Sequence, residues 1–219
     1  MEAINGDGIL SWYFEIPPLT RSYLTLSFLL TSLTTLDLIS PFSLYFNSKL
    51  ILQGQVWRLV SSFGYFGTFS LDFLFHCYFL VRYCRLLEES EFQRRRAAFV
   101  IFFLFGMGIM LCFAPFLKLN FLGSSLTFMM LYVWGRRNEH VQMQIFGVLN
   151  FTAPYLPLVM LLLSAFLGNS TTIDMLGIIA GHCFYFFEYV YPKVAEIRGW
   201  RIKKVLEPPE VLRWLCGDM

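Results

Sequence analysis

Residues 97–116 decide the fold, and they read AAFVIFFLFGMGIMLCFAPF. A helix needs about 20 mostly apolar residues to cross the hydrocarbon core of a bilayer, which is about 30 Å thick. Charged residues lie at both ends of this run: Arg94, Arg95 and Arg96 precede it, and Lys118 follows it. The stretch therefore predicts a transmembrane helix whose first end carries a cluster of positive charge.

The composition of the whole chain also indicates a membrane protein. Of its 219 residues, 57% are hydrophobic, 19% aromatic and 15% charged, whereas soluble domains carry about 25% charged residues. A soluble fold of this size has too little interior to bury 25 Phe, 11 Tyr and 5 Trp. The five cysteines form no C-x-x-C pair, so we expect no disulfide framework, metal site or cofactor.

Five further apolar segments lie on either side of residues 97–116, separated by polar or proline-containing links. The six predicted spans are residues 23–39, 68–84, 97–116, 122–134, 151–167 and 175–190. Pro192 is expected to end the sixth. The second, fourth and fifth spans are near the lower length limit. Short spans make the bilayer thin locally or the flanking residues reach outward.

The basic residues predict the orientation. If the N-terminus is cytosolic, 14 of the 17 Lys and Arg residues are cytosolic, and only Lys49, Arg58 and Lys118 lie on the other face. Cytosolic loops carry such an excess, so we expect an even number of spans and two cytosolic termini. The chain then divides into a cytosolic segment (1–19), an all-α domain of six transmembrane helices (20–192) and a cytosolic tail (193–219).

Ionisable residues inside spans are costly and often functional. Asp72 and His76 are four residues apart, which places them on one helix face. Either they make a structural bond between helices, or they serve function directly. Gly177 and Gly181 form a G-x-x-x-G motif, which allows two helices to approach closely.

Ser125 and His182 are candidates for a nucleophile and its base. Their alternative roles are a small packing residue and a buried histidine whose bonds are satisfied. Trp57 and Arg58 precede the second span on the non-cytosolic side. They are either interfacial anchors, or Arg58 braces the first loop by bonding its carbonyl groups. Asn169-Ser170-Thr171 is a glycosylation sequon close to the membrane.

Several segments together resemble the derlin family, the rhomboid-like pseudoproteases of endoplasmic reticulum quality control. They run in order from about residue 17 to 192 of this chain. The segments are PPLTR (17–21), PFSLYFN (41–47), QVWRL (55–59), RYCRLLEE (82–89), YVWGRRN (132–138) and LGIIAGH (176–182).

This resemblance implies a rhomboid-like six-helix bundle in the endoplasmic reticulum membrane. It implies that Trp57 and Arg58 form the family's luminal-loop motif, and that Gly177 and Gly181 form its sixth-span motif. The implied role is moving misfolded proteins from the endoplasmic reticulum to the cytosol. The short spans and the polar residues Asp72 and His76 lead us to expect that the protein does so by binding these proteins and locally thinning the membrane. Implied partners are misfolded substrates, a membrane E3 ubiquitin ligase complex and a cytosolic AAA ATPase. Three working forms stay open: a monomer, a hetero-oligomer with another rhomboid-like protein, and a homo-oligomer. No nucleic-acid partner is expected.

Two departures from related patterns qualify these expectations. Active rhomboids carry G-x-S-G, whereas this chain has Leu126 after Ser125. Bulky residues also follow His182, so we expect vestigial residues and no proteolysis. The alternative is an active intramembrane serine protease that uses Ser125 and His182. Some derlins end in a Gly-rich tail that recruits the ATPase, and residues 193–219 lack it, so that recruitment is expected to be indirect.

Overall fold

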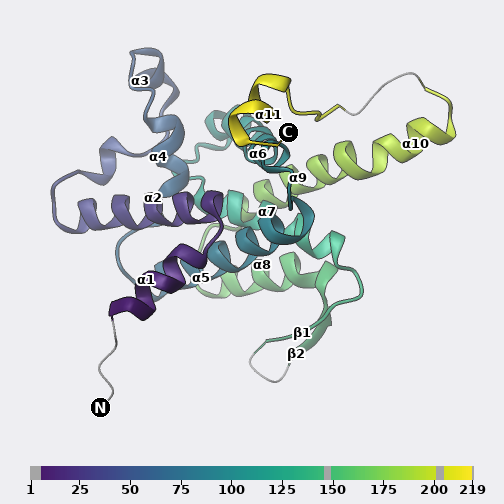
Figure 1. Cartoon of the computed structure of the whole chain (residues 1–219). Coiled ribbons are helices and arrows are strands. Elements are labelled where there is room, and N and C mark those ends of the chain that lie inside the picture. Colours follow the sequence, from purple (N-terminus) through teal and green to yellow (C-terminus); the bar gives the residue numbers. More distant parts are fainter. Residues whose placement is uncertain (1–5, 146–148, 201–204, 219) are drawn as a thin grey trace.

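The computed structural model describes residues 6–145, 149–200 and 205–218, and the protein is mostly helical (Figure 1). Its longer helices are α1 (Gly6–Glu15), α2 (Pro18–Thr35), α5 (Leu71–Leu86), α6 (Arg96–Leu117), α7 (Gly123–Arg137), α8 (Leu156–Phe166) and α9 (Thr171–Tyr185). Its shorter helices are η1 (Pro41–Ser43), α3 (Ser48–Leu52), α4 (Arg58–Gly64), η3 (Ala153–Tyr155), α10 (Tyr191–Ile197) and α11 (Glu210–Cys216). Two π-helical turns, η2 (Leu87–Glu91) and η4 (Phe186–Val190), follow α5 and α9.

A helix occurs at each predicted span: α2, α5, α6, α7, α8 and α9 follow the predicted order. Within the described ranges, two helices combine enough length and hydropathy to cross a membrane, namely Arg96–Leu117 and the continuous helix Thr171–Ile197. Ala153–Phe166 is apolar but shorter. The prediction of a mostly helical chain is therefore confirmed, and two of its helices are long and apolar enough to cross a membrane. The bundle of six spans stays a prediction.

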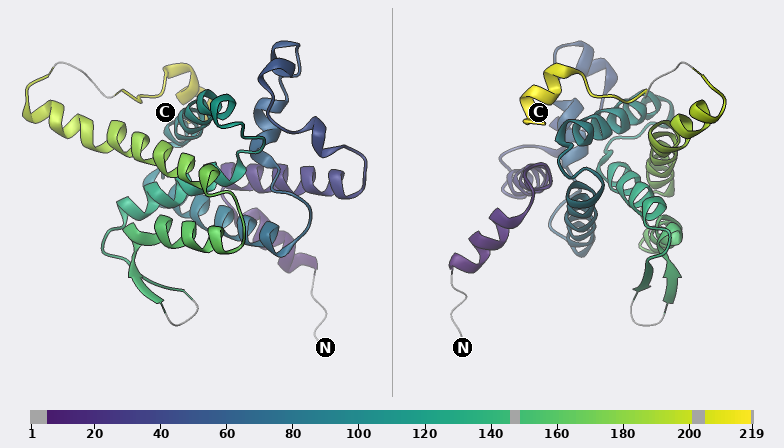
Figure 2. Two further views of the ribbon diagram at one scale, coloured as in Figure 1. Left: turned by 180° about the vertical axis from the view of Figure 1, so that it is seen from behind. Right: turned by 45° about the vertical axis from the view of Figure 1, so that its right-hand side comes forward.

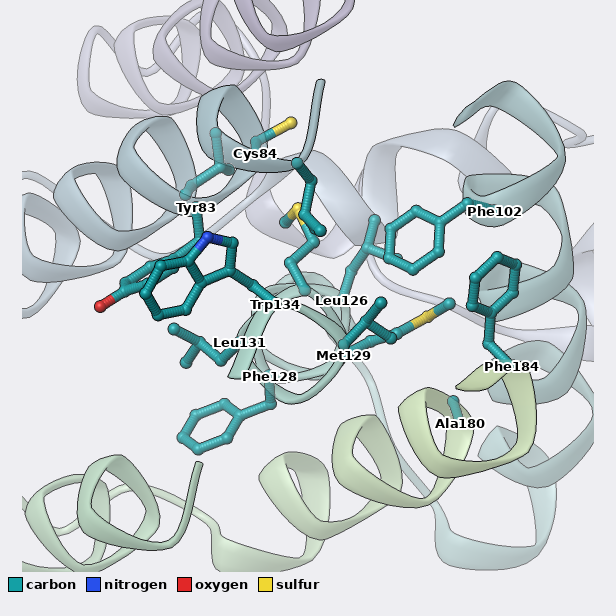
Figure 3. Close-up of a cluster of buried hydrophobic side chains, with 14 of the residues drawn as sticks. Tyr83, Cys84, Phe102, Leu126, Phe128, Met129, Leu131, Trp134, Ala180 and Phe184 are labelled. Carbon is teal, nitrogen blue, oxygen red and sulfur yellow. The ribbon is translucent and has the colours of Figure 1, made fainter. Parts of the chain in front are cut away.

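Helix α7 forms the centre of the core. Eleven of its 15 residues are buried, and α4, α5, α6, α8 and α9 all pack against it. Figure 3 shows Leu126, Met129 and Leu131 extending from α7 toward side chains of the neighbouring helices, among them Tyr83 and Phe184. In lipid, close packing rather than escape from water holds such helices together. The polar groups that α7 carries at its first turn are thereby fixed in the middle of the bundle.

The fifth predicted span, residues 151–167, is wrong at its beginning. Helix α8 begins at Leu156, because Pro154 and Pro157 suit a helix start but not its interior. The residues before it form an antiparallel hairpin, in which β1 (Gln142–Ile145) pairs with β2 (Leu149–Thr152). As a result, α8 is only 11 residues long.

The sixth predicted span, residues 175–190, is too short at both ends. The helix starts at Thr171 and continues through Pro192 to Ile197. The π turn η4 lies just before the proline. A π turn changes the hydrogen-bond spacing from i−4 to i−5, so it can accommodate a proline that would otherwise break the helix. Pro192 therefore does not end this helix.

The first span, its loop and the tail also differ from expectation. Helix α2 covers Pro18–Thr35 instead of residues 23–39, because Pro18 fits the first turn of a helix. The loop after it holds η1 and α3, and α3 lies at the opposite end of the molecule from α10 (Figure 2). The tail contains α11. Residues 1–5 of the predicted cytosolic segment and Arg201, Lys203 and Lys204 of the tail lie outside the described residues.

Candidate functional site

Gly177 and Gly181 lie where α9 meets α7. A methyl group at Gly177 would overlap the carbonyl oxygen of Ser125. One at Gly181 would lie 2.9 Å from Cβ of Tyr132 and 3.1 Å from the carbonyl oxygen of Met129. Close approach of backbones is the usual reason for small residues between membrane helices. These two glycines let α9 pack directly on the backbone of α7.

Ser125 and His182 are not brought together. Ser125 is fully buried, and its hydroxyl donates to the carbonyl oxygen of Ile173 at 2.5 Å. His182 is exposed, and its Nδ1 lies 2.6 Å from the hydroxyl of Tyr132. Tyr132 is seven residues from Ser125, about 10 Å along the helix. A serine nucleophile needs its base within hydrogen-bond reach, so the two residues do not form a catalytic pair in this structure.

Asp174 is the side chain of α9 that bonds to the first turn of α7. It is 1% exposed. Its carboxylate accepts hydrogen bonds from Ser124 at 2.5 Å and from Ser164 of α8. Asp174 lies just before the sixth predicted span, residues 175–190, and its role was not predicted. One signal was present: Asp174, Gly177 and Gly181 follow the i, i+3, i+7 spacing of a single helix face.

Asp72 and His76 lie at a small pocket between α5 and α8. His76 Nε2 is 3.6 Å from Asp72 Oδ2, and Asn169 donates to Asp72 Oδ1 at 2.8 Å. The pocket has a volume of about 30 Å³, enough for one or two water molecules. Ser164 and apolar side chains such as Met160 also line it. Asn169, considered above only as a sequon, thus belongs to a polar cluster inside the helical domain.

The chemistry that this cluster can perform is binding and hydrogen bonding. All five cysteines are free. Across the described ranges, no group of three His, Cys, Asp or Glu side chains could hold a metal ion. The cluster offers hydroxyl, amide, imidazole and carboxylate groups to a small polar group at its surface, such as a water molecule or the end of one polar side chain.

Arg58 bonds the first loop from inside. It is 5% exposed. Its guanidinium donates to the carbonyl oxygens of Phe42 and Tyr45, both at 2.9 Å, and to Gln55 Oε1 at 2.7 Å. Trp57 is 52% exposed, and its indole nitrogen donates to the carbonyl oxygen of Ser43 at 3.3 Å. Of the two alternatives left open above, the contacts of Arg58 match bracing, and the exposure of Trp57 suits an interfacial position.

Replacing Arg58 by Lys should loosen this loop. A lysine is a point charge that cannot reproduce the planar, forked set of donors. We expect a loss of about 1–2 kcal/mol, because buried carbonyl groups lose their partners. The measurement is the thermal midpoint of the purified protein, with Arg85→Lys as the control. Arg85 makes an exposed pair with Glu89, and equal midpoints for the two variants would contradict the bracing role.

Glu88 joins the start of α2 to the π turn η2. It is 7% exposed. Its carboxylate accepts from the backbone nitrogens of Leu19 at 3.1 Å and Thr20 at 2.8 Å, and from the Thr20 hydroxyl at 2.7 Å. The first amide groups of a helix have no partner within the helix, and Pro17 provides no side-chain cap for α2. Glu88 therefore caps α2 from a distant part of the chain.

An ion pair and a cation–π contact join other helix ends near α10. Arg137 donates to Glu91 of η2 at 2.7 Å and lies 4.4 Å from the ring centroid of Tyr189 in η4. Burial opposes its charge, but the carboxylate of Glu91 outweighs this, and the pKa of Arg137 is raised. The charged form of Arg137 thus stabilises the contact between the ends of α5, α7 and α9.

This arrangement of packed helices, two of them long and apolar enough to cross a bilayer, is typical of a multi-helix membrane protein. The model of the Der1-like family matches residues 16–203. Derlin-2.1 of Zea mays is 43% identical, with 97% of this chain and 88% of the relative covered. Derlin-2.1 of Arabidopsis thaliana is 44% identical, with 97% and 90% covered. A probable derlin-2 homolog of Dictyostelium discoideum is 37% identical, with 85% and 77% covered. The chain belongs to the Der1-like family, the derlins.

Proposed function

We propose that this protein is a non-enzymatic factor of endoplasmic reticulum-associated degradation. It assists the movement of misfolded proteins from the lumen to the cytosol by binding polar segments and locally thinning the membrane. Its membership of the derlins supports a role in this degradation. The proposal includes six spans and two cytosolic termini in the endoplasmic reticulum membrane. It also includes partnership with a membrane E3 ubiquitin ligase complex, and indirectly with a cytosolic AAA ATPase.

The observation that carries this proposal is the pocket between α5 and α8. Asp72, His76 and Asn169 bring hydrogen-bonding groups together where the start of α5 meets the end of α8. A polar group at the bilayer centre otherwise costs several kcal/mol. A lining that can bond such a group lowers this cost for a polypeptide segment in transit.

The length of α8 supports local thinning. Its 11 residues reach about 16 Å, roughly half of the hydrocarbon thickness. Even with η3, which adds three residues, the apolar helix stays below the usual spanning length. A bilayer that matches so short an element is thinner beside it. The polar pocket therefore lies next to the place where the barrier would be lowest.

The contacts of Ser125 support a role without proteolysis. Its hydroxyl is committed to a backbone carbonyl, and His182 bonds elsewhere. A fluorophosphonate probe should therefore leave Ser125 unlabelled, and Ser125→Ala should keep full function in cells. Labelling of Ser125, with loss of cleavage in the alanine variant, would favour the intramembrane protease instead.

The direct test replaces His76 by Leu and follows a misfolded luminal reporter in a chase experiment. We expect the half-life of the reporter to rise about threefold while the abundance of the derlin stays unchanged, because an apolar lining no longer bonds polar segments. In cells with His76→Asn, which keeps a polar group, the half-life of the reporter should be nearly normal. The matched control is Tyr78→Leu, since Tyr78 is an exposed residue of the same helix. An unchanged half-life in His76→Leu would remove the pocket from the mechanism.

A further inference from the structure

A second pocket is lined by residues around the start of α3, and α3 lies far from α10 (Figure 1). Its volume is about 310 Å³, and it lies between the start of α3 and the end of α6. Lys49 of α3 and Lys118, which follows α6, both line it, together with Asn47 and Asn120. Among the described residues that line this pocket, none is acidic.

The positions of the two lysines are set by the backbone. Asn47 Oδ1 accepts from the backbone nitrogens of Lys49 and Leu50 at 3.0 and 3.3 Å, which fixes the start of α3. Lys118 has a left-handed backbone, with φ of 53°, at the end of α6. A hydrogen bond of 2.8 Å from the nitrogen of Phe46 to the carbonyl oxygen of Asn120 ties the two segments together. Lys49 and Lys118 thus line one pocket from two segments, the start of α3 and the end of α6, that are joined by a backbone hydrogen bond.

The charge distribution makes this pocket unusual. Lys49, Arg58 and Lys118 are the only basic residues that the predicted orientation places on the luminal side. Arg58 is buried and bonds to the first loop. The other two are exposed and line the same pocket. The luminal positive charge that is open to a ligand is therefore concentrated at one place.

Apolar side chains on the same two elements indicate what kind of anion fits. Leu52 of α3 is 89% exposed, and Phe116 of α6 is 82% exposed. Exposed apolar groups beside lysines are typical of the membrane interface, where side chains face acyl chains and ammonium groups reach the phosphate level. Leu52 is three residues after Lys49, and Phe116 is two residues before Lys118. A soluble anion would use the lysines but would gain nothing from these exposed apolar side chains.

We propose that the pocket between α3 and the end of α6 binds the phosphate of a phospholipid headgroup through Lys49 and Lys118. The bound lipid lies with its acyl chains along Leu52 and Phe116. This lipid holds the headgroup region of the luminal leaflet at the same depth as the end of α6. The luminal placement rests on the proposed function and its orientation, but the binding itself is measured on the purified protein and does not depend on degradation.

The test is a titration of the purified full chain in detergent, followed by native mass spectrometry. The probe is dioleoyl phosphatidic acid. Lys49→Gln combined with Lys118→Gln should weaken binding about fivefold for each lysine removed, hence about 25-fold for both. The matched control, Lys193→Gln with Arg198→Gln, removes the same charge at the α10 end and should bind like the natural chain. Lys49→Arg with Lys118→Arg should bind within about twofold of it, because the charges remain.

Three outcomes would overturn the proposal. Equal weakening in the α10 control would mean that overall charge, not this pocket, attracts the lipid. Equal binding of dioleoylglycerol, which lacks the phosphate, would mean that only the acyl chains are recognised. Displacement of the lipid by inorganic phosphate at the same concentration would mean that the pocket takes a soluble anion. Degradation is measured separately. A normal reporter half-life in the Lys49/Lys118 variant would show that degradation does not need the bound lipid, and would leave the binding result unchanged.

Discussion

Replacing Gly177 by Ala should lower the thermal midpoint of this derlin by roughly 6–12 °C. The added methyl group would overlap the Ser125 carbonyl oxygen and lie 2.8 Å from Cβ of Phe128. Both atoms are fixed by α7, so the helices must separate. Overpacking of this kind costs up to about 3 kcal/mol, and 1 kcal/mol shifts the midpoint of a chain of this size by about 2–4 °C. Thermal unfolding of the purified protein in detergent measures the effect.

Two other glycines provide graded controls in α6. A methyl group at Gly106 would overlap the Met129 side chain, which is flexible and can move. A methyl group at Gly108 would meet nothing within 4 Å. We expect Gly106→Ala to lower the midpoint less than Gly177→Ala does, and Gly108→Ala to leave it unchanged or raise it slightly, because Ala favours helix. If all three variants had the same midpoint, the close approach of α9 to α7 would not contribute to stability.

The apolar runs were sufficient to predict where the main helices lie, because about 20 apolar residues leave few alternatives in a membrane. They were not sufficient at the prolines. Pro154 and Pro157 fix the start of α8, so the helix is shorter than the apolar run that predicted it. Pro192, by contrast, lies inside a continuous helix, because the π turn before it accommodates the proline. The same residue type has opposite consequences, depending on backbone spacing that the sequence does not display.

The polar cluster was harder to predict than the helices. Asp72 and His76 could be paired from their spacing, since they lie on one helix. Asp174 bonds to Ser124 and Ser164, which lie on two other helices, so its role depends on how three helices rotate against one another. Ser125 and His182 failed as a pair for the same reason. Their residue types suggested a nucleophile and a base, but the register of α9 on α7 places His182 beside Tyr132.

Replacing Glu88 by Ala should release the start of α2 and cost about 3 kcal/mol. Two backbone amides and the Thr20 hydroxyl would lose their shared acceptor. Each buried donor left without a partner costs about 1–3 kcal/mol, and water that enters the gap can offset part of this. The measurement is the thermal midpoint, together with hydrogen exchange of a peptide that covers the first turn of α2. Exchange of the Leu19 and Thr20 amides should accelerate, while the centre of α7 stays protected.

The neighbouring residue provides the matched control, because Glu89 is a glutamate of the same π turn that faces solvent. It pairs with Arg85 at 2.8 Å, and its side chain is 46% exposed. Such pairs contribute about 0–1 kcal/mol, so Glu89→Ala should leave both the midpoint and the exchange of α2 nearly unchanged. Glu88→Gln should lie between the two alanine variants, since its amide oxygen can still accept one or two bonds. Because the cap joins residues 68 and 69 positions apart, a selective loss in Glu88→Ala would show that α2 is held in place by the π turn after α5, not by its own sequence.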